Sequence, residues 1–411
     1  MHICIVTPGQ LGSNPRVVKE ADALHSAGHR VTVIATQTLD RVEPRDQSII
    51  RRIPWNLRRI DLRSRIRWRS LRLIQHTARK GFEITKLPVF ANLGFSAFTS
   101  ALTAMALRNP ADFYIAHYPA ALPAVAAASR WHGVRYAFDA EDFHLGDLAN
   151  APEHRLANLM IRSIEGRYLP GAAYVSAASP LIADAYAAEY GIHRPAVVLN
   201  VFPRANAPVA PSARGITEPG PSIYWFSQTI GAGRGLEAAI IAISLAKSRP
   251  HLYLRGTPAA GYREQLAKLA RSHAVEDRLH FLSPAVPDEL ERLGAEYDLG
   301  YAGETGETRN RCIAITNKIF SYLLGGIPIL ASDIPAHQEL RLALGPAIQT
   351  FPVGNSDALA AAMDSYLLDD AGMKAARLHA WELAQTRYCW EVEITSLFSA
   401  LGNLAAPKLE K

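Results

Sequence analysis

The chain has 411 residues, of which 49% are hydrophobic, so we expect two domains of roughly 200 residues, each with its own core. Its three cysteines, Cys4, Cys312 and Cys389, lie far apart in the sequence, which argues against a disulfide framework and against a structural zinc site. The formal net charge is +6. These features predict a cytoplasmic protein.

The first part of the chain predicts a parallel α/β domain. Residues 2–7 form an apolar strand without the basic flank of a secretory signal. Asn14 caps a helix that has Pro15 at its first position, and residues 30–35 form the next strand. Strand and helix pairs follow at 113–117 with 120–130, 135–139 with 152–165, and 173–176 with 180–190. Apolar strands joined by helical crossovers indicate a sheet that is covered on both faces.

A basic segment interrupts this pattern at residues 51–80. It carries a net charge of +10, which leaves −4 for the rest of the chain, and Trp, Leu and Ile alternate with its arginines. Such a segment suits an anionic membrane surface, where each basic residue contributes about 1 kcal/mol. A solvated helix is the alternative, and nucleic acid is not expected. The residues predicted to form this membrane or acceptor surface are Arg58, Arg59, Arg65, Arg67, Trp68 and Arg69.

The apolar run at residues 87–107 follows directly. It contains Asn92 and several Ser and Thr residues, so it predicts a buried helix and not a membrane span.

The second α/β domain follows a proline-rich linker. Five prolines occur between 203 and 221, with little periodicity. The predicted domains are therefore residues 1–203 and 222–387, joined by a linker at 204–221. Strands of the second domain are expected at 223–227, 252–255, 279–282 and 299–302. Two doubly wound, Rossmann-like sheets would then face each other across a cleft, and ligands bind such sheets outside the carboxyl ends of their strands.

A short helix at residues 317–324 is the most informative feature of the second domain. Thr316 or Asn317 can cap it, and Gly325 with Gly326 ends it. Its amino terminus offers N–H groups and a positive dipole to an anion. Lys318 has the wrong charge for helix stability in this first turn, which indicates a ligand contact. The alternative is an ordinary surface lysine.

A glycine-rich loop, Gly231-Ala232-Gly233-Arg234-Gly235, follows the first strand of the same domain. Gly233 lets the backbone approach an anion, and the guanidinium of Arg234 can bind a phosphate through two N–H groups. Turn geometry alone is the alternative reason for the glycines. Together with Lys318, the loop predicts a diphosphate site.

Three common cofactor motifs are absent from the sequence. It has no Asp-x-Asp, the carboxylate pair that holds a divalent ion on a nucleotide diphosphate, so we expect no metal. It has no Walker motif. The loop with Gly12 after the first strand lacks the full dinucleotide fingerprint, so nicotinamide binding is not supported.

Carboxylates and amides follow strands in both domains. Glu141 and Asp142 follow the strand that ends with Asp139, and we expect them to orient a sugar or an acceptor. Helix capping is the alternative. In the second domain the candidates are Glu304, Glu307, Asn310 and Arg311, and solvated loop residues are the alternative there.

These motifs together resemble the retaining glycosyltransferases of family 4, which have the GT-B fold. The resemblance rests on residues 12–16 with 28–31, 138–142, 231–235 and 317–328. It implies that the second domain binds a nucleotide-activated sugar, that the first binds the acceptor, and that a final helix at 388–405 packs back on the first domain.

The chain departs from this family at three places. Many members have two glutamates separated by seven residues, and the aligned positions here are Ile313 and Ser321. The chain looks closer to a branch with Asn-Lys at the helix start. A histidine usual after Asp-Ala is replaced by Glu141, with His144 three positions later, and a usual arginine of the second domain is Gln228.

The resemblance and the residues together predict a metal-independent, retaining glycosyltransferase that moves a sugar from a nucleotide-diphosphate sugar to a hydroxyl acceptor. A saccharide or lipid-linked acceptor in cell-surface polysaccharide synthesis is expected, at the inner face of the membrane. The alternatives are a GT-B epimerase or phosphorylase and a non-catalytic adaptor. The predicted catalytic residues are Glu141, Asp142, Arg234 and Lys318. The predicted donor-binding residues are Gly12, Gln228, Gly233, Arg234, Glu304, Glu307, Asn310, Arg311, Thr316, Asn317 and Lys318.

Overall fold

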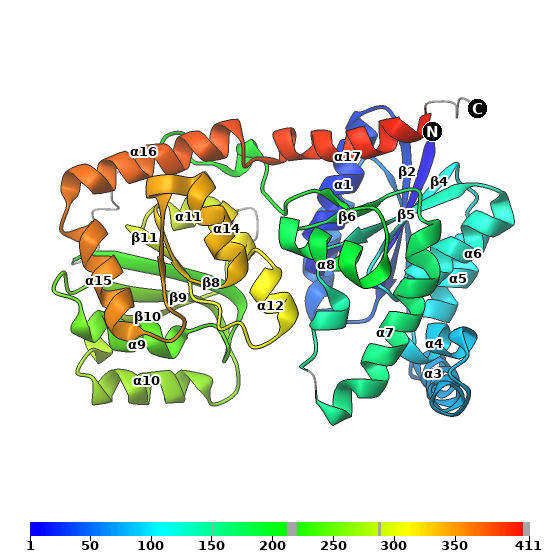
Figure 1. The fold of residues 1–411 in the computed structure, drawn as a ribbon, viewed down its shortest axis with the longest axis horizontal. Helices are drawn as coiled ribbons and strands as arrows, with labels where there is room; N and C mark the ends of the chain where they lie inside the picture. The colour runs from blue at the N-terminus through cyan, green and yellow to red at the C-terminus, as the bar shows by residue number, and fades with distance from the viewer. Residues whose placement is uncertain (150, 212–219, 287–288, 406–411) are drawn as a thin grey trace. The chain divides into compact units, whose positions relative to one another are not determined.

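The structure, a computed structural model, describes residues 1–149, 151–211, 220–286 and 289–405 (Figure 1). It divides into two compact units, one formed by Met1–Val198 with the residues from Ser396 onward, and the other by Leu199–Thr395. Each unit contains one parallel sheet with helices on both faces. The predicted α/β fold with two Rossmann-like sheets is therefore confirmed. The predicted linker is described over 204–211 and 220–221, and residues 212–219 lie outside the described part.

The sheet of the N-terminal unit has the strand order β3-β2-β1-β4-β5-β6-β7. Ile3 to Val6 in its central strand are fully buried, as expected for a strand that is covered on both faces. His117 pairs in register with Asp139 at the carboxyl ends of β4 and β5. The strands are β1 (His2–Val6), β2 (Arg30–Gln37), β3 (Asn56–Asp61), β4 (Phe113–His117), β5 (Arg135–Ala140), β6 (Val175–Ala177) and β7 (Ala196–Val197).

Several helices of this unit begin at a proline or at a capping side chain. The side chain of Asn14 accepts a hydrogen bond from the Val17 amide at the start of α1, and Ser179 does the same for Ile182 at the start of α8. The helices are α1 (Pro15–Ser26), α2 (Glu43–Ile50), α3 (Arg65–Thr85), α4 (Pro88–Phe95), α5 (Thr99–Leu107), α6 (Leu122–His132), α7 (Arg155–Tyr168) and α8 (Pro180–Tyr190).

The apolar run at 87–107 forms two helices, so the prediction of one buried helix is wrong. Ser96 has extended backbone angles, its hydroxyl accepts from the Phe98 amide, and α4 and α5 are bent by 103° at this break. No single described helix is both long and apolar enough to cross a membrane, and α4 and α5 meet those criteria only as this bent pair.

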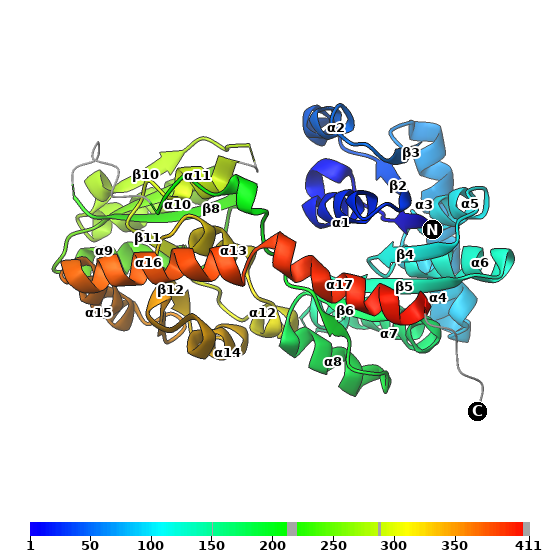
Figure 2. The ribbon, with the colours of Figure 1, turned by 90° about the horizontal axis from the view of Figure 1, so that it is seen from above.

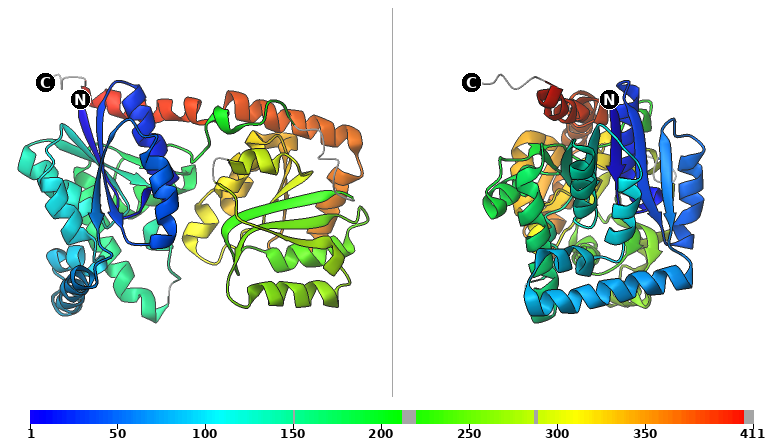
Figure 3. Two further views of the ribbon diagram at one scale, coloured as in Figure 1. Left: turned by 180° about the vertical axis from the view of Figure 1, so that it is seen from behind. Right: turned by 90° about the vertical axis from the view of Figure 1, so that its right-hand side faces the viewer.

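Helix α3 lies along an edge of the N-terminal unit. It is seen end-on in Figure 1 and nearly side-on in the right panel of Figure 3. Of its 21 residues, only Ala78 and Phe82 are buried. Most of this helix is therefore in contact with solvent.

The sheet of the C-terminal unit has the strand order β10-β9-β8-β11-β12-β13. The strands are β8 (Ser222–Ile230), β9 (His251–Pro258), β10 (Leu279–Leu282), β11 (Leu299–Ala302), β12 (Ile329–Ser332) and β13 (Ile348–Phe351). The helices are α9 (Leu236–Leu245), α10 (Tyr262–Ser272), α11 (Leu290–Gly294), α12 (Arg309–Ile313), α13 (Asn317–Leu324), α14 (Pro335–Leu344), α15 (Ser356–Leu367) and α16 (Asp370–Thr386). Helix α17 (Trp390–Ala405) begins in this unit, and its residues from Ser396 belong to the N-terminal unit (Figure 2).

The two faces of this sheet carry different side chains. Ile223 and Trp225 of β8 belong to a hydrophobic core with residues of α9, α10 and α15. Tyr224 and Phe226 point to the opposite face, where each ring packs edge-on against Tyr322 of α13. This packing fixes α13 against the sheet, with its amino terminus near the carboxyl ends of β8 and β11.

Candidate functional site

The glycine loop at 231–235 is held by side chains from the neighbouring segment. The hydroxyl of Tyr301 donates to the carbonyl of Gly235 at 2.7 Å, and the guanidinium of Arg311 donates to the carbonyl of Gly233 at 2.8 Å. Gly233 and Gly235 have φ angles of 74° and 63°, which side-chain-bearing residues rarely adopt. The loop therefore needs glycine at these two positions and is fixed by its partners.

Gly235 also needs the space that a side chain would take. A Cβ atom at Gly235 would lie 2.6 Å from the carbonyl oxygen of Gly303 and 2.8 Å from the Tyr301 hydroxyl. At Gly233 the nearest atoms, at 3.0 Å, are the flexible ends of Arg311 and Glu307. The backbone of the loop thus comes closest to its neighbours, Tyr301 and Gly303, at Gly235.

Beside this loop, a buried carboxylate lies between two cations. Nη1 of Arg234 lies 3.0 Å from Oε2 of Glu304, and Nζ of Lys318 lies 3.6 Å from Oε1 of the same residue. The Lys318 ammonium is also 3.3 Å from the Thr316 hydroxyl and 5.5 Å from the centre of the Trp225 ring. Glu304 and Lys318 are 6% and 8% exposed, so both charges are withdrawn from water.

Burial and charge act on these groups in opposite directions. Burial lowers the pKa of Lys318 and outweighs the attraction of Glu304, which would raise it. Burial would raise the pKa of Glu304, but the charges of Lys318 and Arg234 hold that pKa below its ordinary value. Because two cations share one carboxylate, the cluster has an excess positive charge that an anionic ligand would neutralise.

Helix α13 adds its amino terminus to this cluster. It begins after Thr316, whose side chain makes no capping hydrogen bond, and its first turn contains no acid. The positive end of the helix dipole is thus unopposed by a carboxylate of its own first turn. Arg234, Lys318, the glycine loop and this terminus together form what we name the cationic edge.

The structure brings some of the predicted donor residues to this edge and leaves others outside it. Glu304, Arg311 and Thr316 contact the loop or Lys318. The Glu307 carboxylate lies beside Gly233 and Asn317 is the first residue of α13, so both are also at this edge, whereas Asn310 is buried in α12. Gln228 is exposed at an irregularity in the pairing of β8 with β9.

Sequence reasoning missed three residues of this region. Tyr301 and Trp225 resemble ordinary sheet aromatics in the sequence, and only their contacts to Gly235 and Lys318 set them apart. Glu291 of α11 is 1% exposed, and its Oε1 accepts from the Ser321 hydroxyl at 3.2 Å. A buried acid therefore contacts the position where many family members carry the second glutamate, and no local sequence signal indicated it.

The N-terminal unit has a second cluster of charged residues at the carboxyl ends of its strands. Arg16 of α1 donates to both carboxylate oxygens of Asp139, from Nε at 2.6 Å and from Nη2 at 2.8 Å. Ser176 of β6 donates to Oδ1 at 2.5 Å. Burial would raise the pKa of Asp139, but the Arg16 guanidinium outweighs it, so this pKa is lowered.

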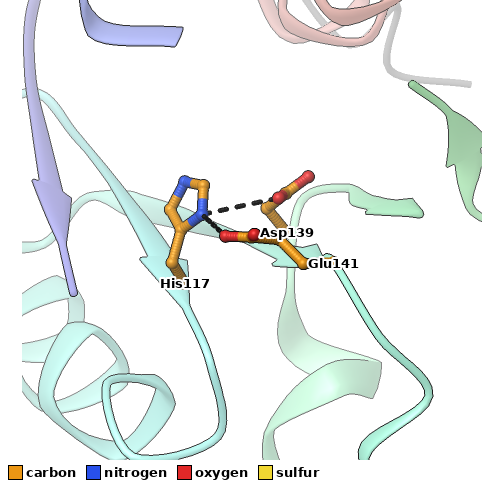
Figure 4. A group of neighbouring side chains, drawn as sticks. All are labelled: His117, Asp139 and Glu141. Atoms are coloured by element: carbon orange, nitrogen blue, oxygen red, sulfur yellow. Dashed lines mark hydrogen bonds and ion pairs between the residues drawn. The ribbon is translucent and has the colours of Figure 1, made fainter. Parts of the chain in front are cut away.

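His117 connects three carboxylates of this cluster, of which Figure 4 shows Asp139 and Glu141. Its Nε2 lies 2.6 Å from Oε2 of Glu20, and its Nδ1 lies 3.1 Å from Oε1 of Glu141 and 3.4 Å from Oδ2 of Asp139. Burial would lower the pKa of His117, but Glu20, Glu141 and Asp139 raise it to about 10. The imidazole is therefore charged at neutral pH and donates from both nitrogens.

His117, Asp139 and Glu141 could also provide ligand atoms for a metal, since these atoms lie within 4.8 Å of one another. Both oxygens of Asp139, however, already accept from Arg16. A divalent ion at this point would be close to a guanidinium. The arrangement thus fits a charged imidazole better than a metal ion.

Of the predicted residues in this unit, Glu141 is part of the cluster and Gly12 is not. The Gly12 amide donates to Oδ1 of Asp46 at 2.8 Å, so this N–H is already paired. Asp142 follows Glu141, and its backbone carbonyl accepts from the Tyr186 hydroxyl at 3.2 Å. His144 is buried, with Nδ1 2.7 Å from the Tyr186 hydroxyl and 3.1 Å from Oε1 of Glu165.

Five of the six residues predicted for the surface of the basic segment are exposed, and Arg59 is half-buried. Arg59 is paired with Glu43, and Arg67 donates to the carbonyl of Asp61 at 2.7 Å. The ring of Trp68 packs against Phe98, with centres 5.8 Å apart. The five exposed residues are Arg58, Arg65, Arg67, Trp68 and Arg69.

Comparison with known proteins places the chain among glycosyltransferase folds. Residues 12–203 match the family model of the glycosyl transferase 4-like domain. HepE from Anabaena, solved in complex with UDP, has a TM-score of 0.71 at 16% identity, covering 98% of this chain and 100% of its own. Sucrose-phosphate synthase from Thermosynechococcus elongatus has a TM-score of 0.74 at 14% identity, covering 98% and 99%.

A third solved structure is WaaG, a glycosyltransferase involved in lipopolysaccharide biosynthesis, with a TM-score of 0.61 at 13% identity, covering 97% and 98%. No curated protein matches the chain. Residues 12–203 thus match a glycosyl transferase 4-like domain, and the chain as a whole has the GT-B fold of these solved structures.

Proposed function

We propose that this protein transfers a sugar from a nucleotide-diphosphate sugar to a hydroxyl acceptor, with retention of anomeric configuration and without a metal ion. The observation that carries the proposal is the cationic edge, where Lys318 and Arg234 both contact the carboxylate of Glu304. HepE, which has the same fold, was solved with UDP and with UDP-glucose, which supports a nucleotide sugar as the donor.

The donor would bind through its diphosphate. Arg234 and Lys318 would exchange part of their contact with Glu304 for the diphosphate oxygens, and the first amides of α13 would add uncharged donors. As the bond between the anomeric carbon and the diphosphate breaks, these groups stabilise the negative charge that develops on the leaving oxygen. Positive side chains thus take the part that a divalent ion plays elsewhere.

The acceptor would bind to the N-terminal unit. Its hydroxyl attacks the anomeric carbon on the face from which the diphosphate leaves, and a phosphate oxygen takes its proton, so no protein base is required. Glu141 and Asp142 would orient the acceptor or the donor sugar. A saccharide or lipid-linked acceptor of cell-surface polysaccharide synthesis is the class that we propose, and the similarity to WaaG supports it.

The transfer is tested by a panel of nucleotide sugars. A true donor raises the thermal midpoint in proportion to its occupancy, and this identifies the sugar and the base. The product with that donor and methyl glycoside acceptors is then analysed by NMR, and retention predicts the same anomeric configuration as in the donor. An inverted product would contradict the retaining mechanism. A donor converted without any acceptor would favour an epimerase.

We further propose that the exposed side of α3 contacts an anionic membrane surface. Ile66, Leu73 and Ile84 are 83%, 67% and 83% exposed, and their spacing places them along one side of the helix. The helix carries six basic residues and one acid. Arg65, Arg69, Arg79 and Lys80 have no ion pair or hydrogen bond from their side chains within the described residues. Exposed aliphatic groups beside unpaired cations suit the interface of an anionic bilayer.

This contact is tested by cosedimentation with vesicles of phosphatidylcholine and phosphatidylglycerol. We expect binding that is lost in the variant R65E/R69E/R79E/K80E and weakened in I66S/L73S/I84S. The control R41E/R108E/R130E/R167E changes the same number of charges outside α3 and should bind as the wild type does. If the control loses as much binding as the α3 variant, the attraction is due to net charge and the assignment to α3 is wrong.

A further inference from the structure

Tyr118 has a backbone conformation that its residue type disfavours. It lies between His117, the last residue of β4, and Pro119, and it is one of the few described non-glycine residues with positive φ, at 66°. The left-handed region costs roughly 1–2 kcal/mol for an L-residue, and a residue before proline is normally extended. Its carbonyl accepts from the Ala121 amide at 3.0 Å in the turn into α6. Glycine would form this turn with less strain.

The side chain of Tyr118 lies beside the charged cluster of the N-terminal unit. It is partly exposed, and its ring meets His144 edge-on, with centres 5.8 Å apart and an interplanar angle of 62°. Burial, followed by the charges of Glu141, Asp142 and Asp139, raises its pKa, so the phenol keeps its proton. Within the described residues, its hydroxyl forms no hydrogen bond. The phenol is therefore a donor without a partner.

His144 gives a second unused polar atom at the same place. It is 5% exposed, and its Nε2 is buried without a hydrogen-bond partner in the described part of the chain. Burial would lower the pKa of His144, but its contact with Glu165 raises it above the ordinary value. An unpaired polar atom costs about 1–3 kcal/mol when it is buried. Strain and an unsatisfied group next to one another are typical of a binding site.

The charges around Tyr118 indicate what kind of ligand fits. Glu141, Asp142 and Asp139 supply three carboxylates near the phenol, against the two cations Arg16 and His117. This excess of negative charge repels a phosphate. An uncharged ligand with hydroxyl groups can instead accept from the phenol, donate to the carboxylates and place its C–H groups on the aromatic ring.

We infer that Tyr118 is a saccharide-binding residue of the acceptor site, and that its backbone strain is retained because the phenol contacts the sugar. The inference rests on the proposed function, and it names the side chain that recognises the acceptor. Tyr118 acts by binding and orienting and takes no part in proton transfer.

The test measures saturation-transfer NMR and titrations with methyl glycosides of glucose, galactose, mannose and N-acetylglucosamine. For the glycoside that binds, we expect the Kd to rise about tenfold or more in Y118G and severalfold in Y118F. UDP binding should be unchanged in both variants. Equal glycoside affinity in the wild type and both variants, or no glycoside binding by the wild type, would overturn the inference.

The thermal midpoint distinguishes a role of Tyr118 in sugar binding from a role in packing. Since Y118G relieves backbone strain, we expect its thermal midpoint to stay level or rise. The control A274G relieves the same kind of backbone strain at Ala274, an exposed residue of the C-terminal unit with φ 52°. It should leave glycoside affinity unchanged. A fall of more than about 4 °C in Y118G would mean that the residue serves packing. UDP binding without glycoside binding defeats this inference alone, whereas glycoside binding without UDP binding defeats the donor proposal.

Discussion

Arg16 forms a bidentate ion pair with Asp139 and also donates from Nη1 to the carbonyl of Val198 at 2.8 Å. Both side chains are almost fully buried, at 3% and 4% exposure. Arg16 thus ties helix α1 to the end of β5 and to Val198, the residue after which the chain enters the C-terminal unit. The geometry of the pair keeps the carboxylate oriented toward His117.

Replacing one partner of this pair should be costly. R16A leaves the Asp139 carboxylate buried without its guanidinium partner, so we expect the free energy of unfolding to fall by about 3–5 kcal/mol. The double variant R16M/D139L, which removes both charges, should regain much of this loss. Urea unfolding of the full chain measures both. An R16A protein as stable as the wild type would show that Asp139 is not held in this way.

The raised pKa of His117 makes stability depend on pH. In the folded protein this imidazole keeps its proton up to a pKa of about 10, whereas in the unfolded chain it loses the proton near 6.5. The folded state therefore binds more protons between these values, and the stabilisation present below pH 6.5 is lost as the pH rises toward 10. We expect stability to fall between pH 7 and 9, by at most about 1.4 kcal/mol per pH unit.

The variant H117Q removes the titrating group and serves as the control. Its stability should change less over the same pH range than that of the wild type. Parallel pH profiles for the two proteins would assign the dependence to another group.

The two glycines of the donor loop should differ in their tolerance of a methyl group. G235A places Cβ 2.6 Å from a backbone oxygen that cannot move away easily, whereas G233A meets only side-chain ends. Both have positive φ and share the strain of about 1–2 kcal/mol. We expect G235A to weaken UDP binding more than G233A when both are titrated. The reverse order would mean that the close contact of Gly235 with the Gly303 carbonyl does not limit the conformation of the loop.

Tyr301 should support the donor loop without contacting the donor. Y301F removes the hydroxyl that donates to the Gly235 carbonyl, which keeps only the Ala239 amide as a donor, at a cost of about 0.5–1.5 kcal/mol. We expect lower thermal stability and a severalfold weaker affinity for UDP. Y366F removes another buried hydroxyl of this unit, which donates to the carbonyl of Pro346, and should lower stability alone. Equal UDP affinity in Y301F and Y366F would rule out a special role for Tyr301.

Local sequence patterns predicted most strands of both sheets and the start of α13, but not the strands β3, β7 and β13 at the sheet edges. Residues 180–190 and 317–324 form helices as expected, because proline or glycine marks their ends and an apolar face repeats within them. The apolar run at 87–107 was harder, since its composition fits one helix. The bend between α4 and α5 depends on tertiary packing, in which a Cβ at Gly94 would lie 2.8 Å from the Arg79 backbone of α3.

The charged clusters could be predicted only in part. Lys318 and Arg234 stood out because their charge does not suit their local position. His117 did not, since a histidine at the end of an apolar strand resembles a core residue. Its partner Glu20 is 97 positions away, and Arg16 lies 123 positions from Asp139. Only the parallel order of the strands and α1 brings these residues together.

The central claim is that protein cations hold the diphosphate without a metal ion, and calorimetric titration of UDP in the presence of EDTA tests it most directly. We expect the wild type to bind, and K318A and R234A each to bind about 10- to 100-fold more weakly, since each loses a charge-assisted contact of about 1.5–3 kcal/mol. R271A, which removes an exposed arginine paired with Glu276, should bind as the wild type does. Binding that requires manganese, or an affinity unchanged in both K318A and R234A, would contradict the account.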